Sequence, residues 1–230
     1  MDLRLKGKTA LVTGSTAGIG FAIPRALARE GATVTLNGRS GGRVSEATGA
    51  ILNEFPDASV SGFAADLSHA DGVAALIAHR ADIDILINNL GIFEPKPFHE
   101  ISDHDWFRFF EVNVMSGVRL ARHYLPRMME NGWGRILFVS SESGVQIPAE
   151  MIHYGMTKSA QISIARGLAE TTKGTNVTVN SVLPGPTWSE GVEAFVEDLA
   201  KAEGVSREEF EKKFFTQMRP TSMIQRFLDV

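Results

Sequence analysis

The residues best suited to acid–base chemistry are a tyrosine and a lysine four positions apart, Tyr154 and Lys158. On a helix, such residues project from one face, about 40° apart. A lysine ammonium beside a phenol favours the phenolate and so lowers the pKa of the tyrosine. A tyrosine in that setting can exchange protons near neutral pH. Tyrosine–lysine pairs at this spacing are also common on solvated helices, so the pair alone is weak evidence for an active site.

Two further polar positions could serve the same site. Ser140, Ser141 and Ser143 follow the apolar run 135–139, where a hydroxyl would point into the crevice beyond the carboxyl ends of parallel strands. All three compete for this role, and each could instead form a turn. Asn113 lies on an otherwise apolar helix stripe. Its carboxamide must find partners or cost stability, so a satisfied core asparagine is the alternative interpretation.

A glycine-rich segment joins the first apolar run to the first helical stretch: Thr13, Gly14, Ser15, Thr16, Ala17, Gly18, Ile19 and Gly20. Its spacing is not GxGxxG, but the physical basis is the same. Glycines allow a tight turn and a close approach to a pyrophosphate, and the helix N-terminus offers free N–H groups. The alternative is an ordinary turn between a strand and a helix.

The second apolar run ends at Gly38 and Arg39, where a fold that prefers NAD usually carries a carboxylate. An arginine can instead form paired hydrogen bonds with a 2′-phosphate. The sequence therefore favours NADP over NAD, with Arg43 as a second contributor. A solvated surface arginine is the alternative.

Short apolar runs alternate with longer helical patterns up to residue 183. The predicted strands are 9–13, 33–36, 59–64, 83–87, 135–139 and 176–183. The predicted helices are 18–29, 43–54, one opened by a capping box from Ser68 to Asp71, 102–130 opened by a box from Ser102 to Asp105, and 152–172. This alternation predicts βαβ units and an α/β fold with a doubly wound parallel sheet.

Composition limits the class of protein. The 230 residues predict one domain, 1–230, and 43% hydrophobic against 22% charged residues is ordinary for a globular chain. A net charge of −4 argues against nucleic-acid binding. No cysteine is present and the six histidines have no metal-ligand spacing, so we expect no metal site. Without a signal peptide or an apolar span, we expect a cytoplasmic protein that does not bind membranes.

The pattern changes after Pro184. Residues 186–216 predict one or two amphipathic helices without a strand, at the carboxyl edge of the sheet, where a substrate lid would lie. Four phenylalanines in this segment could line an apolar pocket or form the lid's own core: Phe195, Phe210, Phe214 and Phe215.

Taken together, the motifs resemble the short-chain dehydrogenase/reductase family in its single-domain form, over about residues 6–228. The resemblance rests on the order of Thr13-Gly14-x-x-x-Gly18-Ile19-Gly20, Asp66-Leu67, Asn88-Asn89-Leu90-Gly91, Asn113, Ser141, Tyr154-x-x-x-Lys158 and Pro184-Gly185. The step of 13 residues from Ser141 to Tyr154 selects Ser141 over its neighbours. Leu90, where the family usually has alanine, is a departure that predicts a local shift beside the cofactor.

The resemblance implies an oxidoreductase that moves a hydride between NADP and a carbonyl or secondary alcohol. Tyr154 would be the acid or base, Lys158 would lower its pKa and hold the nicotinamide ribose, Ser141 would bind the substrate oxygen, and Asn113 would position a water. The implied cofactor-binding residues are Gly14, Ser15, Thr16, Gly18, Ile19, Gly20, Arg39, Asp66, Leu67, Asn89, Gly91, Tyr154, Lys158, Pro184, Gly185 and Thr187.

Other expectations also follow. The family's long helices often pair between subunits, so a homodimer or homotetramer is expected. The family pattern has a seventh strand after the lid, and its apparent absence predicts a truncated chain with an uncovered sixth strand. A non-catalytic NADP-binding regulatory protein on the same fold is the alternative function, whereas a serine hydrolase is disfavoured because no G-x-S-x-G segment occurs.

Overall fold

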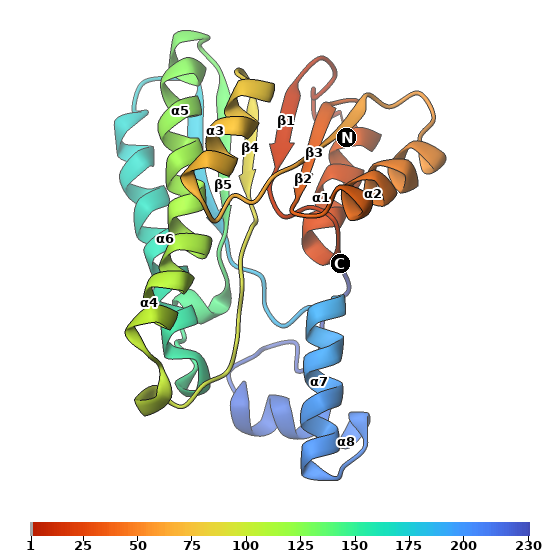
Figure 1. Ribbon diagram of the computed structural model, residues 1–230, viewed down its shortest axis with the longest axis vertical. Helices are drawn as coiled ribbons and strands as arrows, with labels where there is room; N and C mark the ends of the chain where they lie inside the picture. Colours follow the sequence, from red (N-terminus) through yellow and green to blue (C-terminus); the bar gives the residue numbers. More distant parts are fainter. Residues whose placement is uncertain (1) are drawn as a thin grey trace.

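The computed structural model describes residues 2–230, except the side chains of Glu190, Phe195 and Ala202. Its centre is one parallel sheet in the order β3-β2-β1-β4-β5-β6 (Figure 1). The strands are β1 (Thr9–Val12), β2 (Thr33–Gly38), β3 (Val60–Ala64), β4 (Ile85–Asn88), β5 (Gly134–Val139) and β6 (Val177–Val182). The reversal of strand order between β1 and β4 makes the sheet doubly wound, which confirms the α/β prediction.

Helices connect the strands and continue after the last one. The α-helices are α1 (Gly18–Arg29), α2 (Gly41–Glu54), α3 (Ala70–His79), α4 (Asp103–Phe110), α5 (Ser116–Glu130), α6 (Ile152–Thr171), α7 (Glu190–Glu203) and α8 (Arg207–Lys213). Short 3-10 turns are η1 (Phe98–Glu100), η3 (Glu142–Gly144) and η4 (Ala149–Met151), and π-helical turns are η2 (Glu111–Met115) and η5 (Phe214–Met218).

Both faces of the sheet are buried, which explains why its strands read as continuous apolar runs. Ala10 and Val12 of β1 pack with α1 and α2 on one face. Leu11, between them, packs with α3, α5 and α6 on the opposite face. The alternation of side chains along each strand thus divides the apolar runs between two cores.

Two sequence-based boundaries need correction. Ser68 does not open a capping box, because helix α3 begins one residue later, after His69, and the Ser68 hydroxyl donates to Asp66 Oδ1 at 2.6 Å. The predicted helix 102–130 does begin with the expected Ser102–Asp105 box, but it is not a uniform α-helix. The π-helical turn η2 interrupts it and carries Asn113.

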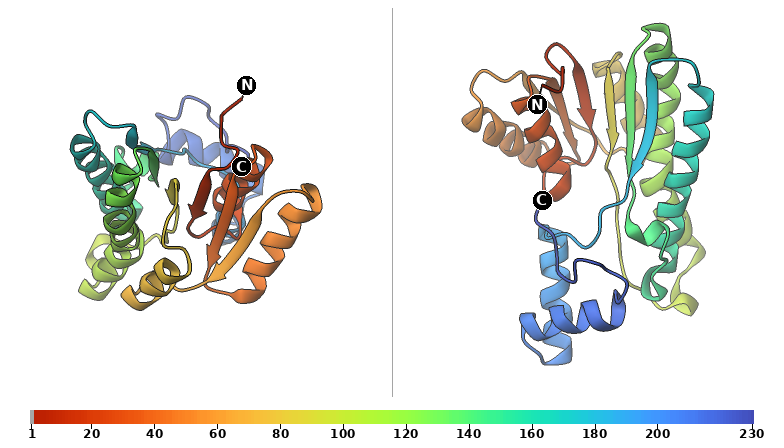
Figure 2. Two further views of the ribbon diagram at one scale, coloured as in Figure 1. Left: turned by 90° about the horizontal axis from the view of Figure 1, so that it is seen from above. Right: turned by 180° about the vertical axis from the view of Figure 1, so that it is seen from behind.

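Residues 190–218, here called the C-terminal helical segment, form a separate layer beyond the carboxyl ends of the strands (Figure 2). As predicted, this segment is helical and contains no strand. Its core is apolar and includes Phe210, Phe214 and Phe215, whereas the side chain of Phe195 lies outside the described residues. The chain then returns, and Leu228 pairs with Thr187 in an isolated parallel bridge.

The sheet ends at β6, and the described residues 2–230 contribute six strands to it. Val182 and Leu183, at the end of this strand, are exposed. Among the described residues, no helix is both long enough and apolar enough to cross a membrane.

Candidate active site

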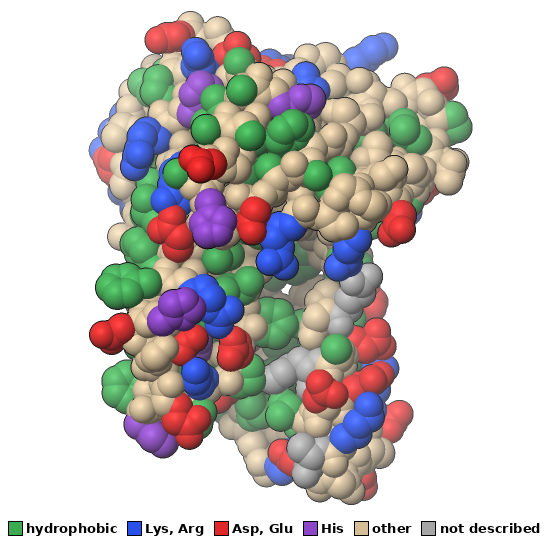
Figure 3. Space-filling view, in the orientation of Figure 1, with side chains coloured by type: hydrophobic (Ala, Val, Ile, Leu, Met, Phe, Trp, Pro, Cys, Tyr) green, Lys and Arg blue, Asp and Glu red, His purple; other side chains and the backbone are tan. Residues whose placement is uncertain are grey.

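A cleft of about 940 Å³ lies between the carboxyl ends of the strands and the C-terminal helical segment. Most of the predicted site residues line it: Gly14, Thr16, Gly18, Ile19, Gly20, Arg39, Leu67, Asn89, Gly91, Ser141, Tyr154, Lys158, Pro184, Gly185 and Thr187. Figure 3 shows the hollow between the sheet and the segment, with basic side chains on its upper rim. The fold therefore gathers predicted residues from seven separate parts of the sequence into one cavity.

The glycine turn at one end of the cleft is held by close backbone contacts. A Cβ atom on Gly20 would lie 2.2 Å from the Gly14 carbonyl oxygen and 2.5 Å from Asn89 Nδ2, which no side chain could tolerate. Asn89 Nδ2 donates to the carbonyl oxygens of Thr13 and Gly14, at 3.0 and 2.8 Å. Helix α1 begins here, after Ala17, whose side chain cannot cap it. The turn thus brings uncapped N–H groups to the cleft wall, which suits a pyrophosphate.

Ser15, a predicted cofactor ligand, is not among the residues that line the cleft. It is fully buried, its hydroxyl donates to Val12 O at 2.8 Å, and it accepts from the backbone N–H of Asn37 at 2.9 Å. Ser15 also donates its own backbone N–H to Asn37 O. Its polar groups therefore fasten the glycine turn to β2 rather than face the cleft.

The basic end of the cleft lies after β2, where Arg39 and Arg43 line the cavity. Asp66, which was expected to contact adenine, is not among the lining residues, although its neighbours Ala65 and Leu67 are. Burial would raise the pKa of the Asp66 carboxyl, but hydrogen bonds from Ser68 and the charge of Arg39 outweigh burial and lower it. Asp66 is therefore ionised, and its carboxylate is engaged by Ser68.

Tyr154 lines the cleft together with Ser141, to which it is hydrogen-bonded. Burial raises the pKa of the Tyr154 phenol above its ordinary value, although a hydrogen bond with Ser141 and the charge of Arg219 act in the opposite direction. The sequence argument predicted a lowered pKa, and this direction was wrong. The physical reason is that removal from water penalises the phenolate more than its neighbours stabilise it.

Lys158 occupies the buried side of the cleft, with its Nζ atom 5.6 Å from the centroid of the Tyr154 ring. Its ammonium donates to Val139 O at 2.9 Å and to Gln161 Oε1 at 3.3 Å. Both acceptors in these hydrogen bonds are neutral oxygens, and neither is a carboxylate. Burial lowers the pKa of Lys158 to about 8. The lysine is thus a buried cation held by neutral acceptors.

Gln161 connects this lysine to the π-helical turn. Its Nε2 donates to the Asn113 carbonyl oxygen at 2.6 Å, so the carboxamide lies between Asn113 and Lys158. The Asn113 side chain is also fully engaged, because it exchanges two hydrogen bonds with the backbone of Ile92 and donates to Thr157 Oγ1. The π-helical turn therefore fastens both the loop after β4 and the helix that carries Lys158.

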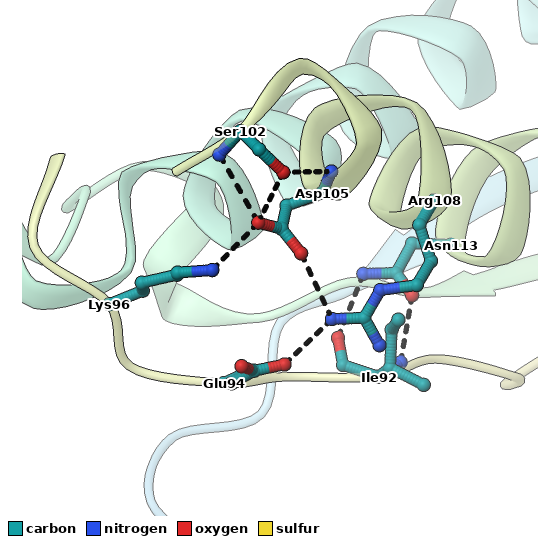
Figure 4. A network of polar contacts seen from close by, with 7 residues as sticks. All are labelled: Ile92, Glu94, Lys96, Ser102, Asp105, Arg108 and Asn113. Atoms are coloured by element: carbon teal, nitrogen blue, oxygen red, sulfur yellow. Dashed lines mark hydrogen bonds and ion pairs between the residues drawn. The ribbon is translucent and has the colours of Figure 1, made fainter. Parts of the chain in front are cut away.

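Polar contacts along helix α4 hold the same loop (Figure 4). Lys96 Nζ donates to Asp105 Oδ2 at 2.8 Å, and Arg108 Nη2 donates to Glu94 Oε2 at 2.6 Å. Asp105 also caps the helix by accepting from Ser102. Together with Asn113, these contacts fix the loop 91–96, of which Gly91, Ile92 and Phe93 line the cleft.

Three charged residues lie together at the substrate side, of which the sequence pointed to Glu142 and Glu150 as possible contacts of a polar substrate but not to Arg219. Arg219, which follows the C-terminal helical segment, lies in the cavity with Glu142 and Glu150. Its Nη2 atom is 3.0 Å from Glu150 Oε1, and its Nε atom is 3.4 Å from Glu142 Oε1. Nothing in the sequence around Arg219 reveals this contact, whereas Gln161 could have been found as the residue one turn after Lys158.

Comparison with known proteins agrees with this geometry. The family profile described as short chain dehydrogenase matches residues 8–200. The chain belongs to the short-chain dehydrogenase/reductase family. It is therefore an oxidoreductase of the NAD(P)-dependent type, on a Rossmann-like fold.

The alignments of this chain with its relatives cover most of each relative's length. An oxidoreductase of Bacillus subtilis, YvrD, is 51% identical over 99% of this chain and 86% of its own. The 3-oxoacyl-[acyl-carrier-protein] reductase FabG of Aquifex aeolicus is 35% identical over 80% of this chain and 76% of its own. L-Sorbose reductase of Gluconobacter frateurii, solved with NADPH and L-sorbose, superimposes with a TM-score of 0.90 at 30% identity, covering 100% of this chain and 87% of that one.

Proposed function

We propose that this protein is an NADP-dependent oxidoreductase that moves a hydride between the nicotinamide and a carbonyl or secondary alcohol, with Tyr154 as the acid or base. The observation that carries the proposal is the meeting of Tyr154, Ser141 and Lys158 with the glycine turn in one cleft. The NADPH-bound L-sorbose reductase supports a reduction of this kind.

The chain's own residues support each proton movement. The raised pKa keeps Tyr154 protonated at neutral pH, so its hydroxyl can donate a proton to a carbonyl oxygen during reduction. Ser141 supplies a second hydrogen bond at the same position, and the Lys158 cation favours the phenolate left after transfer. The glycine turn would hold the pyrophosphate of the cofactor, and Pro184, Gly185 and Thr187 would hold its nicotinamide, which would supply or accept the hydride.

Replacement of Tyr154 tests this mechanism. Tyr154→Phe removes the exchangeable proton but keeps the ring, so turnover should fall at least a thousandfold, within the range attributed to general acid catalysis. NADPH affinity, measured by fluorescence titration, should change less than threefold. Full activity in the variant would contradict the role of Tyr154, and NADPH binding without turnover in the wild type would favour the regulatory alternative.

The preference for NADP rests on Arg39 and Arg43 at the basic end of the cleft. A hydrogen bond to a charged group contributes about 1.5–3 kcal/mol, so Arg39→Ala should weaken NADPH binding about tenfold or more and leave NADH binding nearly unchanged. Equal losses for both cofactors would mean that Arg39 does not read the 2′-phosphate. Lys201→Ala, on the exposed side of α7, provides a control for loss of a surface cation.

Two expectations about assembly belong to the same proposal. Residues 186–216 act as the substrate lid of a single domain, and the protein forms a homodimer or homotetramer through its long helices. The exposed side chains of Phe107, Phe110 and Met129 on α4 and α5 support such pairing. Light scattering at several concentrations tests it, and a monomer at all of them would contradict it.

A further inference from the structure

The three charged residues at the substrate side of the cleft form a compact group that no step of the proposed mechanism uses. Glu142 and Glu150 lie between β5 and α6, in the segment that also carries Ser141. Arg219 reaches them from the opposite side, where it packs on the Phe214 ring at 5.3 Å. Glu142, Arg219 and Tyr154 line the same cavity.

The guanidinium of Arg219 is fully committed. The side chain is 9% exposed, it forms ion pairs with both carboxylates, and its Nη1 donates to Met218 O at 2.8 Å. Two carboxylates therefore share one cation, and their sum is one negative charge. The other cations that line the cavity do not neutralise this negative charge. Arg39 and Arg43 lie at the basic end after β2, and Lys158 donates to Val139 and Gln161.

The carboxylates also retain capacity to accept hydrogen bonds. Glu150 Oε1 is buried, and its contact with Arg219 lacks hydrogen-bond geometry, so it has no donor among the described residues. Glu142 Oε2 faces Gly185, where a Cβ atom would still lie 3.7 Å away, so this side of the carboxylate is open. An accessible carboxylate oxygen such as Glu142 Oε2 can accept a hydrogen bond from a hydroxyl group of a ligand.

We propose that the substrate is a small uncharged carbonyl compound with hydroxyl groups close to the carbonyl, and that Glu142 and Glu150 bind these hydroxyls and exclude carboxylated substrates. This inference rests on the proposed function and specifies its substrate class. Hydroxyls are donors that match two carboxylate acceptors, whereas a substrate carboxylate would be desolvated against a net negative charge, a placement that costs several kcal/mol. Phe93, Met151 and Phe214 line the same cavity and suit the C–H faces of such a compound.

Two matched pairs of compounds test the two halves of the proposal. Methyl acetoacetate and acetoacetate differ in charge, and 1,3-dihydroxyacetone and acetone differ in hydroxyls. We expect kcat/KM, followed by NADPH absorbance, to be at least a hundredfold higher for the neutral ester than for the acid, and at least tenfold higher for dihydroxyacetone than for acetone. Equal values within either pair would overturn that half of the proposal.

A variant connects the preference to the charged group. Glu150→Gln keeps the size of the side chain and an acceptor but removes one charge, so discrimination against acetoacetate should fall at least tenfold. Glu208→Gln, on exposed helix α8, is the matched control and should leave it unchanged. If Glu150→Gln discriminates as strongly as the wild type, the carboxylate is not the selecting group.

Binding to the Tyr154→Phe variant separates this inference from the proposed function. Calorimetric titration of that variant, saturated with NADPH, compares affinity for the ester and the acid without turnover. Tighter binding of the ester by the variant, together with a wild type that reduces none of the compounds, would sustain the substrate class and overturn the reaction. Turnover that depends on Tyr154 but ignores charge would sustain the reaction and overturn the substrate class.

Discussion

The sheet and the C-terminal helical segment are stabilised in different ways. The sheet has an apolar core on each face, and its strands share hydrogen bonds along their full lengths. The segment packs on a small core of its own, in which Phe227 contacts Phe214 and Phe215 with ring centroids 5.2 and 5.1 Å apart. Backbone bonds at Leu228 and the ion pairs of Arg219 join it to the remainder.

This difference separates two functions in space. The residues proposed for proton transfer and cofactor binding lie on the sheet side, where packing fixes their positions. The group proposed to select the substrate is completed from the other side, by an arginine that follows the helical segment. A small separate core can change position, or change in sequence, without disturbing the sheet.

Truncation of one large side chain in each core should give the largest effects and tests whether the two regions unfold independently. Leu86 of β4 is fully buried, so Leu86→Ala should lower the free energy of unfolding by about 2–5 kcal/mol. Phe227→Ala removes a comparable contact from the small core, but we expect its cost to appear as local opening. Hydrogen exchange should speed at least tenfold in α7 and α8 and stay unchanged in β4 and β5. Uniform acceleration throughout would mean that the two cores unfold as one.

A methyl group added to the glycine turn tests the rigidity of the sheet side. Gly20→Ala places a Cβ atom against Gly14 and Asn89, and overpacking of this kind costs about 1–3 kcal/mol. We expect NADPH affinity to fall more than tenfold, with a smaller loss of thermal stability. Gly49→Ala, on helix α2 with open space around it, is the control and should stabilise the protein by about 0.5–1 kcal/mol.

Mild acid should also destabilise the sheet region more than the C-terminal helical segment, with a smaller effect on stability than the substitutions above. His153 of α6 is fully buried against Phe109, with ring centroids 4.0 Å apart, and burial lowers its pKa despite the opposing charges of Asp105 and Glu94. The unfolded state therefore binds a proton that the folded state does not, and stability falls as the pH drops below about 6.5. The apolar core of the C-terminal helical segment has no such group.

Melting temperatures between pH 7.5 and 5.5 measure this effect. His153→Phe should melt at temperatures that depend less on pH than those of the wild type. His99→Phe, at an exposed position, is the control and should leave the dependence as it was. An unchanged slope in His153→Phe would show that another group governs the acid response.

Short-range rules predicted most of the sheet region. The apolar runs located all six strands of the described sheet, and the Ser102–Asp105 box located the start of α4, because these signals act within a few residues. The π-helical turn at Asn113 was not predicted, since it depends on contacts with Ile92 and Thr157 that are distant in the sequence. For the same reason, the hydrogen bonds that join Ser15 to Asn37 of β2 could not be predicted from the sequence.

The sequence by itself determined the α/β architecture, the glycine turn and the set of residues able to exchange protons, because periodicity and residue type are local properties. Only the tertiary structure decided which charges meet. It raised the pKa of Tyr154 through burial, placed Gln161 between Asn113 and Lys158, and joined Arg219 to two glutamates about 70 residues away. Burial and long-range contact set these energies, and neither can be read from the spacing of residues along one chain.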